Sequence, residues 1–198
     1  MITLRKPSTE TVCAFLASQS GLDLSYPEVG ATATGPPSEY AVDHTRTRLG
    51  EGEAVYAAAK AALGRWEQFN LGWVQAWSPD DSIKVGGLVG VTGRSLGLWW
   101  LNACRVVYVV DERDGPVTKF GFAYGTLPEH AESGEERFLI EWDRASDGGV
   151  WYDILAFSRP QQFFARLGYP WVRRLQKRFG RDSANAMANA VAADRAGD

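Results

Sequence analysis

The sequence predicts an α+β fold in which a seven-stranded antiparallel sheet wraps around one long C-terminal helix, with short helices near the N-terminus. The first observation behind this prediction is a run of six segments rich in β-branched and aromatic residues, separated by turn sequences. They cover residues 70–77, 85–94, 99–111, 118–127, 135–143 and 150–158. The second observation is a helical pattern that follows them and continues to about residue 193.

A helix, a strand and a second helix are predicted before these six segments. Ser8 is a suitable N-cap for a helix over residues 9–19. Residues 40–49 alternate with a period of two, which predicts a strand. From Glu51 onward, apolar residues recur on one helical stripe, so a second helix follows this strand.

Turn chemistry predicts how the strands pair. Residues 79–81, 114–116 and 147–149 contain Pro, Asp or Gly, which supply the fixed or positive φ of tight turns. Strands joined by such short connections pair antiparallel. The sequence therefore predicts a sheet built from neighbouring hairpins.

The C-terminal helix is predicted in two parts. Ser158 and Gln161 form a capping box around Pro160, which predicts a helix start at this point. A second proline, Pro170, interrupts that helix because it lacks an N–H and clashes with the preceding turn, so a longer helix begins there. The apolar stripe predicted for the longer helix consists of Trp171, Leu175, Phe179, Ala186 and Ala190.

The length of 198 residues predicts a single domain over residues 1–198, with an N-terminal helical segment at 1–21 and a disordered tail at 194–198. The two cysteines are far apart and have no neighbouring histidine, so neither a disulfide nor a metal site is predicted. The net charge of −3 gives no indication of a nucleic-acid partner. We expect a cytoplasmic protein, because no signal peptide or membrane span is recognisable. We also expect a monomer or weak homodimer, and no cofactor.

Five ordered segments carry a resemblance to one family. They read Tyr-Pro-Glu-Val-Gly-Ala-Thr at 26–32, Asp-His-Thr-Arg-Thr-Arg-Leu-Gly at 43–50, Phe-Gly-Phe-Ala-Tyr-Gly-Thr-Leu-Pro at 120–128, Gly-Glu-Glu-Arg-Phe at 134–138 and Ala-Phe-Ser-Arg-Pro at 156–160. Over residues 22–187 the chain resembles the uncharacterised family UPF0548, also called domain of unknown function 1990. The order of its elements is similar to the helix-grip arrangement of START-like and Bet v 1-like proteins, which implies a cavity between sheet and helix.

The strand over residues 40–49 carries the first candidate site. His44, Arg46 and Arg48 share one face of this strand, and Asp43 lies on the other. An imidazole beside guanidinium groups can bind or polarise a ligand, and we expect the cluster to open toward the mouth of the cavity. The alternative is an edge strand that charges protect from aggregation, or a set of ion pairs with Glu residues of a neighbouring strand.

Strand parity predicts which other side chains face the cavity. Alternating aromatic residues at 120–124 and 138–142 are expected to point inward, so Glu141 points outward. The predicted lining residues are Phe120, Phe122, Tyr124, Phe138, Ile140, Trp171 and Leu175, and Arg105 is added to the ligand-binding group. Both faces of the last strand are apolar, so its parity stays open.

The acid–base candidates are His44, Tyr124 and Asp153. If Asp153 is buried, it needs a charged or hydrogen-bonding partner, which Arg105 or Arg46 can supply. A structural ion pair at Asp153 is the alternative to a catalytic role.

Residues 154–181 contain Arg and Lys but no acidic residue, so the long helix is basic. We interpret this as a solvated outer face and do not expect a membrane surface as partner. The leading functional hypothesis is a protein that encloses a small hydrophobic or amphipathic ligand. The alternatives are a START-like enzyme of the cyclase or hydratase type and an interaction protein whose core is filled by its own side chains.

Overall fold

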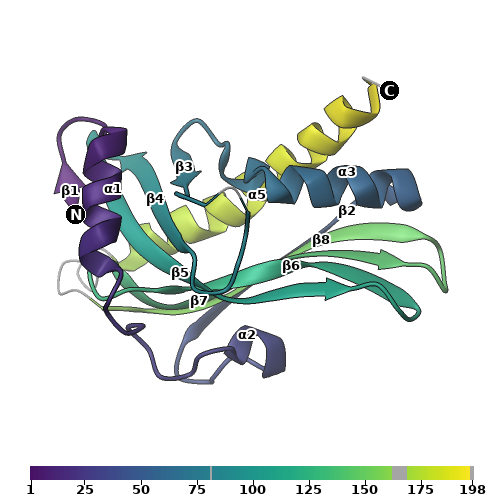
Figure 1. The fold of residues 1–198 in the computed structure, drawn as a ribbon, viewed down its shortest axis with the longest axis horizontal. Helices are drawn as coiled ribbons and strands as arrows, with labels where there is room; N and C mark the ends of the chain where they lie inside the picture. The colour runs from purple at the N-terminus through teal and green to yellow at the C-terminus, as the bar shows by residue number, and fades with distance from the viewer. Residues whose placement is uncertain (81, 162–168, 197–198) are drawn as a thin grey trace.

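One curved antiparallel sheet forms the centre of the computed structural model, which describes residues 1–80, 82–161 and 169–196 (Figure 1). Seven strands follow the order β2-β8-β7-β6-β5-β4-β3, and β1 pairs with β5 outside this path. The strands are β1 (Ile2–Thr3), β2 (Ala41–Glu51), β3 (Val74–Trp77), β4 (Leu88–Ser95), β5 (Leu98–Glu112), β6 (Val117–Thr126), β7 (Glu132–Asp143) and β8 (Gly149–Pro160).

Helices lie on both faces of this sheet. The helical elements are α1 (Thr9–Gln19), α2 (Ala31–Thr34), α3 (Glu53–Gly64), the 3₁₀ helix η1 (Glu67–Phe69) and α5 (Tyr169–Ala196). We call the face covered by α3, η1 and α5 the concave face, and the face on which α2 lies the convex face (Figure 1). This arrangement confirms the predicted helix-grip fold, with α2, η1 and β1 as additions that the sequence analysis did not predict.

Local chemistry explains where several elements begin. Ser8 Oγ accepts a hydrogen bond from the backbone N–H of Thr11 at 3.3 Å, so α1 begins where the N-cap predicts. β3 starts at Val74 rather than at residue 70, because Gly72 adopts φ +73° in the bend before it.

The predicted helix start at Ser158 is wrong. β8 continues to Pro160, which pairs with Glu132 of β7. β2 pairs with β8 only as far as Ser158, opposite Ala41, so Pro160 lies beyond the end of β2 and its missing N–H is tolerated. The short helix predicted before Pro170 lies mostly at 162–168, outside the described residues.

The C-terminal helix α5 is longer than predicted, since it reaches Ala196 and includes most of the tail expected to be disordered. Residues 197–198 of that tail lie outside the described part. None of the helices in the described ranges combines the length and apolarity needed to cross a bilayer.

The stripe through which α5 packs matches the predicted one only in part, since Phe179 and Ala190 contact the core as expected. Its buried residues are Gly180, Ser183, Ala184, Met187 and Val191, whereas Trp171 is 40% exposed. A Cβ at Gly180 would lie 2.7 Å from Thr45 Oγ1, so glycine allows α5 to approach β2 closely. Because the prediction followed large apolar side chains, it missed a contact made by small ones.

Candidate functional site

The concave face carries the side chains predicted to line a cavity. The predicted parity is confirmed for all five from β6 and β7, namely Phe120, Phe122, Tyr124, Phe138 and Ile140. Phe69 of η1 enters the space above them, with its ring centroid 5.4 Å from that of Phe138 and 5.3 Å from that of Phe179. These rings therefore form a packed core, and Trp171 and Leu175 of α5 lie outside that cluster.

A row of polar side chains crosses the concave face beside this core. Asp43 on β2, Glu136 on β7 and Tyr124 on β6 make up this row, and Ala156 on β8 lies in register between Asp43 and Glu136. Tyr124 Oη donates a hydrogen bond of 2.7 Å to Glu136 Oε2. Burial, with a smaller contribution from the charge of Asp43, raises the pKa of Glu136 to about 7. Glu136 is therefore a carboxyl group that exchanges a proton near neutral pH.

The first half of α5 is anchored to the sheet by polar contacts next to this row. Both terminal guanidinium nitrogens of Arg173 donate hydrogen bonds to the Asp43 carboxylate, one of them to Oδ1 at 2.7 Å. Gln176 Nε2 donates to Glu132 Oε2 and to Ser158 Oγ, each at 2.8 Å. The basic helix thus uses Arg173 to hold its position, not to face solvent.

The convex face holds a second cluster, around the buried carboxylate of Asp153, which is 3% exposed. Asp153 accepts hydrogen bonds from His44 Nε2 at 2.7 Å, from Arg137 at 2.8 Å and from Arg46 at 3.2 Å. Burial raises the pKa of Asp153, but the hydrogen bonds and charges of His44 and Arg137 outweigh it, so the net pKa is lowered. Asp153 is therefore ionised, and the predicted pairing with Arg46 is confirmed.

The remaining predicted cations lie elsewhere. Arg105 donates to the backbone carbonyls of Leu22 at 2.9 Å and Ser20 at 2.7 Å, so it is not the partner of Asp153. Arg48 lies at the surface, 3.2 Å from Glu51 and 3.3 Å from Asp147.

The acid–base trio predicted from the sequence is divided between the two faces of the sheet. His44 and Asp153 lie on the convex face, whereas Tyr124 lies on the concave face with Asp43. His44, Arg46 and Arg48 share one face, as expected, but that face is the one opposite α5, so they do not open toward the aromatic core. The sequence did not reveal this division, because both faces of the last strand are apolar and its parity stayed open.

A buried glutamate on the convex face fastens the segment that contains α2. Glu135, which is 3% exposed, accepts hydrogen bonds from Tyr26 Oη and the backbone N–H of Gly30, both at 2.7 Å. Thr32 adds its backbone N–H at 3.0 Å and its hydroxyl. A Cβ at Gly125 would lie 2.2 Å from Tyr26 Oη, so this glycine makes room for the tyrosine. The family segment at 26–32 thus forms a structural clamp.

Sequence reasoning did not assign Glu135, Glu136 or Arg137 to any site. A signal was present, because Glu136 shares the parity of Phe138 and therefore places a carboxylate among aromatic residues. No such pattern predicted the contacts of Glu135 with residues 26–32 or the ion pair between Arg173 and Asp43, because these groups are far apart in the sequence. Within the described residues, no cluster of three or more His, Cys, Asp or Glu side chains is arranged to hold a metal ion.

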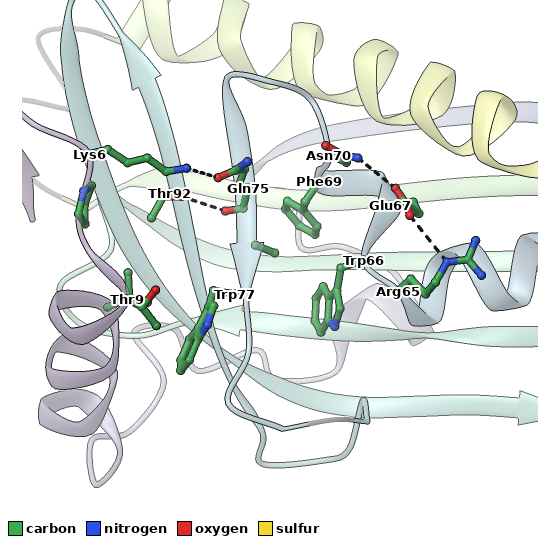
Figure 2. Close-up of a pocket in the computed structure, with 13 residues that line it drawn as sticks. Lys6, Thr9, Arg65, Trp66, Glu67, Phe69, Asn70, Gln75, Trp77 and Thr92 are labelled. Carbon is green, nitrogen blue, oxygen red and sulfur yellow. Dashed lines mark hydrogen bonds and ion pairs between the residues drawn. The ribbon is translucent and has the colours of Figure 1, made fainter. Parts of the chain in front are cut away.

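A pocket of about 430 Å³ opens between α1, η1, β3 and β4, and we call it the α1–β3 pocket (Figure 2). Its aromatic walls are Trp66, Phe69 and Trp77. Lys6 donates to Gln75 Oε1 at 2.6 Å on one side, and Asn70 donates to Glu67 at 3.3 Å on the other (Figure 2). The pocket therefore combines planar apolar walls with a polar rim.

Trp66 has an unusual backbone conformation at this pocket. Its φ of 62° lies in the left-handed region, at the position after Arg65, the C-cap of α3. Glycine commonly occupies this position after a helix, because a side chain there is strained. The indole ring of Trp66 packs 5.0 Å from the ring of Phe122, so the strained residue lies between the pocket and the aromatic core.

Comparisons with known proteins connect this chain to one family and one fold. The family described as Domain of unknown function (DUF1990) matches residues 25–186. A UPF0548 protein of Dictyostelium discoideum is 35% identical, over 98% of each chain. Among solved structures, Ara h 8.0201 has a TM-score of 0.50 at 10% identity and covers 78% of this chain and 99% of its own.

A second structural neighbour is a point mutant of norcoclaurine synthase from Thalictrum flavum in complex with a transition state analogue. It has a TM-score of 0.50 at 12% identity and covers 81% of this chain and 99% of its own. At these identities the likeness concerns the fold.

Proposed function

The chain belongs to the DUF1990 (UPF0548) family, and from this premise and its Bet v 1-like fold we propose that it binds a small amphipathic molecule with a planar ring. The proposed site is the α1–β3 pocket. The observation that carries the proposal is Trp66, whose φ of 62° is kept at the edge of a pocket with aromatic walls. For a residue other than glycine such a backbone conformation costs about 1–3 kcal/mol, and strained residues cluster at functional sites.

The size and chemistry of the pocket support this ligand class. A volume of about 430 Å³ lies within the range of small-molecule sites, ~300–1,000 Å³. Trp66 and Trp77 offer flat surfaces on which a ring can stack. Lys6, Gln75 and Asn70 supply polar groups at the rim, which suit a ligand with one polar end.

The pocket meets the core of the helix-grip fold at Phe69. The Phe69 ring lines the pocket and also packs against two rings of the core. Its centroid lies 6.2 Å from that of Tyr124 and 5.4 Å from that of Phe138. Phe69 therefore separates a bound ligand from the packed aromatic residues behind it. In the structural neighbour norcoclaurine synthase, the same fold holds a transition state analogue, which supports small-molecule binding as a use of this fold.

Native mass spectrometry of the purified protein, followed by titration of ring compounds monitored by NMR, tests the proposal. We expect the signals of the pocket residues to shift, and Trp77→Ala to weaken binding about tenfold, ~1.4 kcal/mol, through loss of a stacking surface. The matched control is Trp171→Ala, because Trp171 is exposed and does not line the pocket. Equal affinities for the two variants, or shifts confined to other surfaces, contradict the proposal.

A second candidate function is acid–base catalysis at the concave polar row. The observation that favours it is the Tyr124–Glu136 hydrogen bond, together with a pKa of about 7 for Glu136. A carboxyl group of this kind can remove or return a proton at neutral pH. The test is deuterium incorporation from D₂O into a panel of carbonyl compounds. Incorporation that Glu136→Gln abolishes supports an enzyme, and its absence in the unmodified protein argues against one.

A further inference from the structure

A second pocket, of about 310 Å³, lies beneath the first half of α3, and we call it the α3 pocket. Its walls come from α3, from β6 and β7 on the concave face, and from the turns that follow β5 and β7. Arg65 and Trp66 of the α1–β3 pocket lie at the opposite end of α3, so the two pockets share no lining residue. The α3 pocket is therefore a separate site, independent of the function proposed for the α1–β3 pocket.

Three buried polar atoms of this pocket's side chains have no hydrogen-bond partner in the described part of the chain. They belong to Tyr56 (Oη), Thr118 (Oγ1) and Trp142 (Nε1). Thr118 is only 5% exposed, and all three side chains line the α3 pocket. Buried polar groups in proteins are nearly always paired, so three together indicate a partner that the chain itself does not supply.

The missing partner must be an acceptor. The indole nitrogen of Trp142 can only donate, and the hydroxyl groups of Tyr56 and Thr118 can both donate. Burial raises the pKa of Tyr56, with a further contribution from the charge of Asp111, so its hydroxyl keeps its proton. Because the three side chains line the same pocket, their donors suit the oxygen atoms of a single group.

The charges around the pocket favour an anion. The lining cations are Lys60, Arg113 and Arg144, and the lining carboxylate is Glu53. Asp111 partly neutralises two of the cations, since it lies 3.4 Å from Lys60 Nζ and 2.8 Å from an Arg113 nitrogen. Together the five groups carry one net positive charge.

Arg144 is the cation best placed to meet a ligand. Its guanidinium lies over the ring of Trp142, at 5.3 Å from the centroid, and it takes part in no ion pair among the described residues. Trp142 in turn stacks on Tyr56, with centroids 5.7 Å apart and planes inclined by 28°. The stack fixes the direction of two of the donors next to an available positive charge.

We propose that the α3 pocket binds a small molecule through an oxyanion group, a carboxylate or a phosphate. Its oxygen atoms accept hydrogen bonds from Trp142 Nε1 and from the hydroxyl groups of Tyr56 and Thr118, and its charge faces Arg144. Hydrogen bonds between charged and neutral groups are stronger than those between neutral groups, so the anion supplies both the missing acceptors and the counter-charge. The pocket volume limits the bound part to a small group.

The indole N–H signal of Trp142 in a ¹⁵N–¹H NMR spectrum is the direct reporter, and Trp142→Phe assigns it. Inorganic phosphate and acetate are titrated separately, with ionic strength held constant by chloride. We expect a saturable shift of this signal, while the indole signal of Trp77 stays in place. The anion that saturates at the lower concentration identifies the preferred class.

Two variants test the assignment. Arg144→Gln should weaken binding at least about tenfold, the effect of losing a charged partner, and Thr118→Val should weaken it without a loss of volume. The matched control is Arg159→Gln, because Arg159 also lies over an aromatic ring, 4.6 Å from the centroid of Tyr40, but on the convex side. If neither anion shifts the Trp142 signal, or if Arg144→Gln and Arg159→Gln bind alike, the proposal is wrong.

Discussion

Tyr124 and Glu136 lie opposite each other on β6 and β7, and the tyrosine hydroxyl donates a 2.7 Å hydrogen bond to the carboxyl group. Both side chains face the concave side, beside the aromatic core. Burial outweighs this hydrogen bond and raises the pKa of Glu136 from 4.5 to about 7. The raised pKa of Glu136 therefore affects both proton transfer at the concave face and the pH dependence of the free energy of unfolding.

Glu136 should make the free energy of unfolding fall as the pH rises from about 4.5 to about 7. In this window the folded state binds more protons than the unfolded state, so a rise in pH favours unfolding. Glu136→Gln keeps an acceptor for Tyr124 and should remove the effect, which is on the order of 3 kcal/mol at about 1.4 kcal/mol per pKa unit. Urea unfolding at several pH values measures it.

The control for this prediction is Glu39→Gln, which neutralises an exposed carboxyl group. A ¹³C NMR titration of the carboxyl groups gives the pKa of Glu136 directly. An ordinary pKa near 4.5 would contradict the expected proton uptake.

Asp153→Asn should destabilise the fold by about 3 kcal/mol, because it leaves the largely buried charge of Arg137 without its carboxylate, whereas the exposed Arg46 keeps Glu141 as a partner. Since the folded pKa of Asp153 is lowered, its contribution is present above the unfolded pKa and is lost as the pH falls through the folded one. Chemical denaturation at neutral pH measures the effect.

Glu51→Gln is the control for this prediction. The Glu51 side chain is 72% exposed and pairs with Arg48 at the surface, where a loss of less than about 1 kcal/mol is expected. Similar losses for the two variants would show that Asp153 does not organise its cluster.

Strand parity explains why much of the sheet was predictable from the sequence. Phe120, Phe122 and Tyr124 repeat with a period of two, so their common face follows from local geometry alone. The N-cap at Ser8 likewise acts within one turn of α1. The helix-grip order of elements could be predicted because each element carries such a local pattern.

The candidate site depended on contacts between distant parts of the chain, and there the predictions were incomplete. Phe69 belongs to η1, a short element without a strong pattern, yet its ring fills the space where a cavity was predicted. His44 and Asp153 come together across 109 positions of the chain on the convex face. The apolar character of both faces of β8 concealed this, because burial on both sides removes the alternation that reveals parity.

Tyr26→Phe should cost about 2 kcal/mol of folding free energy, since it removes one of the donors that satisfy the buried carboxylate of Glu135. Hydrogen exchange should also quicken at the backbone N–H groups of Gly30 and Thr32, which bind the same carboxylate. Tyr40→Phe is a matched control, because Tyr40 also packs edge-on against Phe157 but donates to the partly buried Glu28. Unchanged exchange in Tyr26→Phe would mean that Glu135 does not hold this segment.

The basic helix α5 should not bind acidic vesicles at physiological ionic strength. Arg173 bonds to Asp43, and Arg178 lies 3.0 Å from Asp182, so part of its positive charge is already paired within the protein. Arg174 and Lys177 are exposed, and no ion pair among the described residues involves either of them. Arg181 shares the Asp182 carboxylate with Arg178, so one further positive charge on this helix is uncompensated. At about 1 kcal/mol for each cation near a membrane surface, three such charges give ~3 kcal/mol, too little for stable attachment. Co-sedimentation with vesicles tests this expectation, and salt-reversible binding that is lost in a variant with both Arg174→Glu and Lys177→Glu would overturn it.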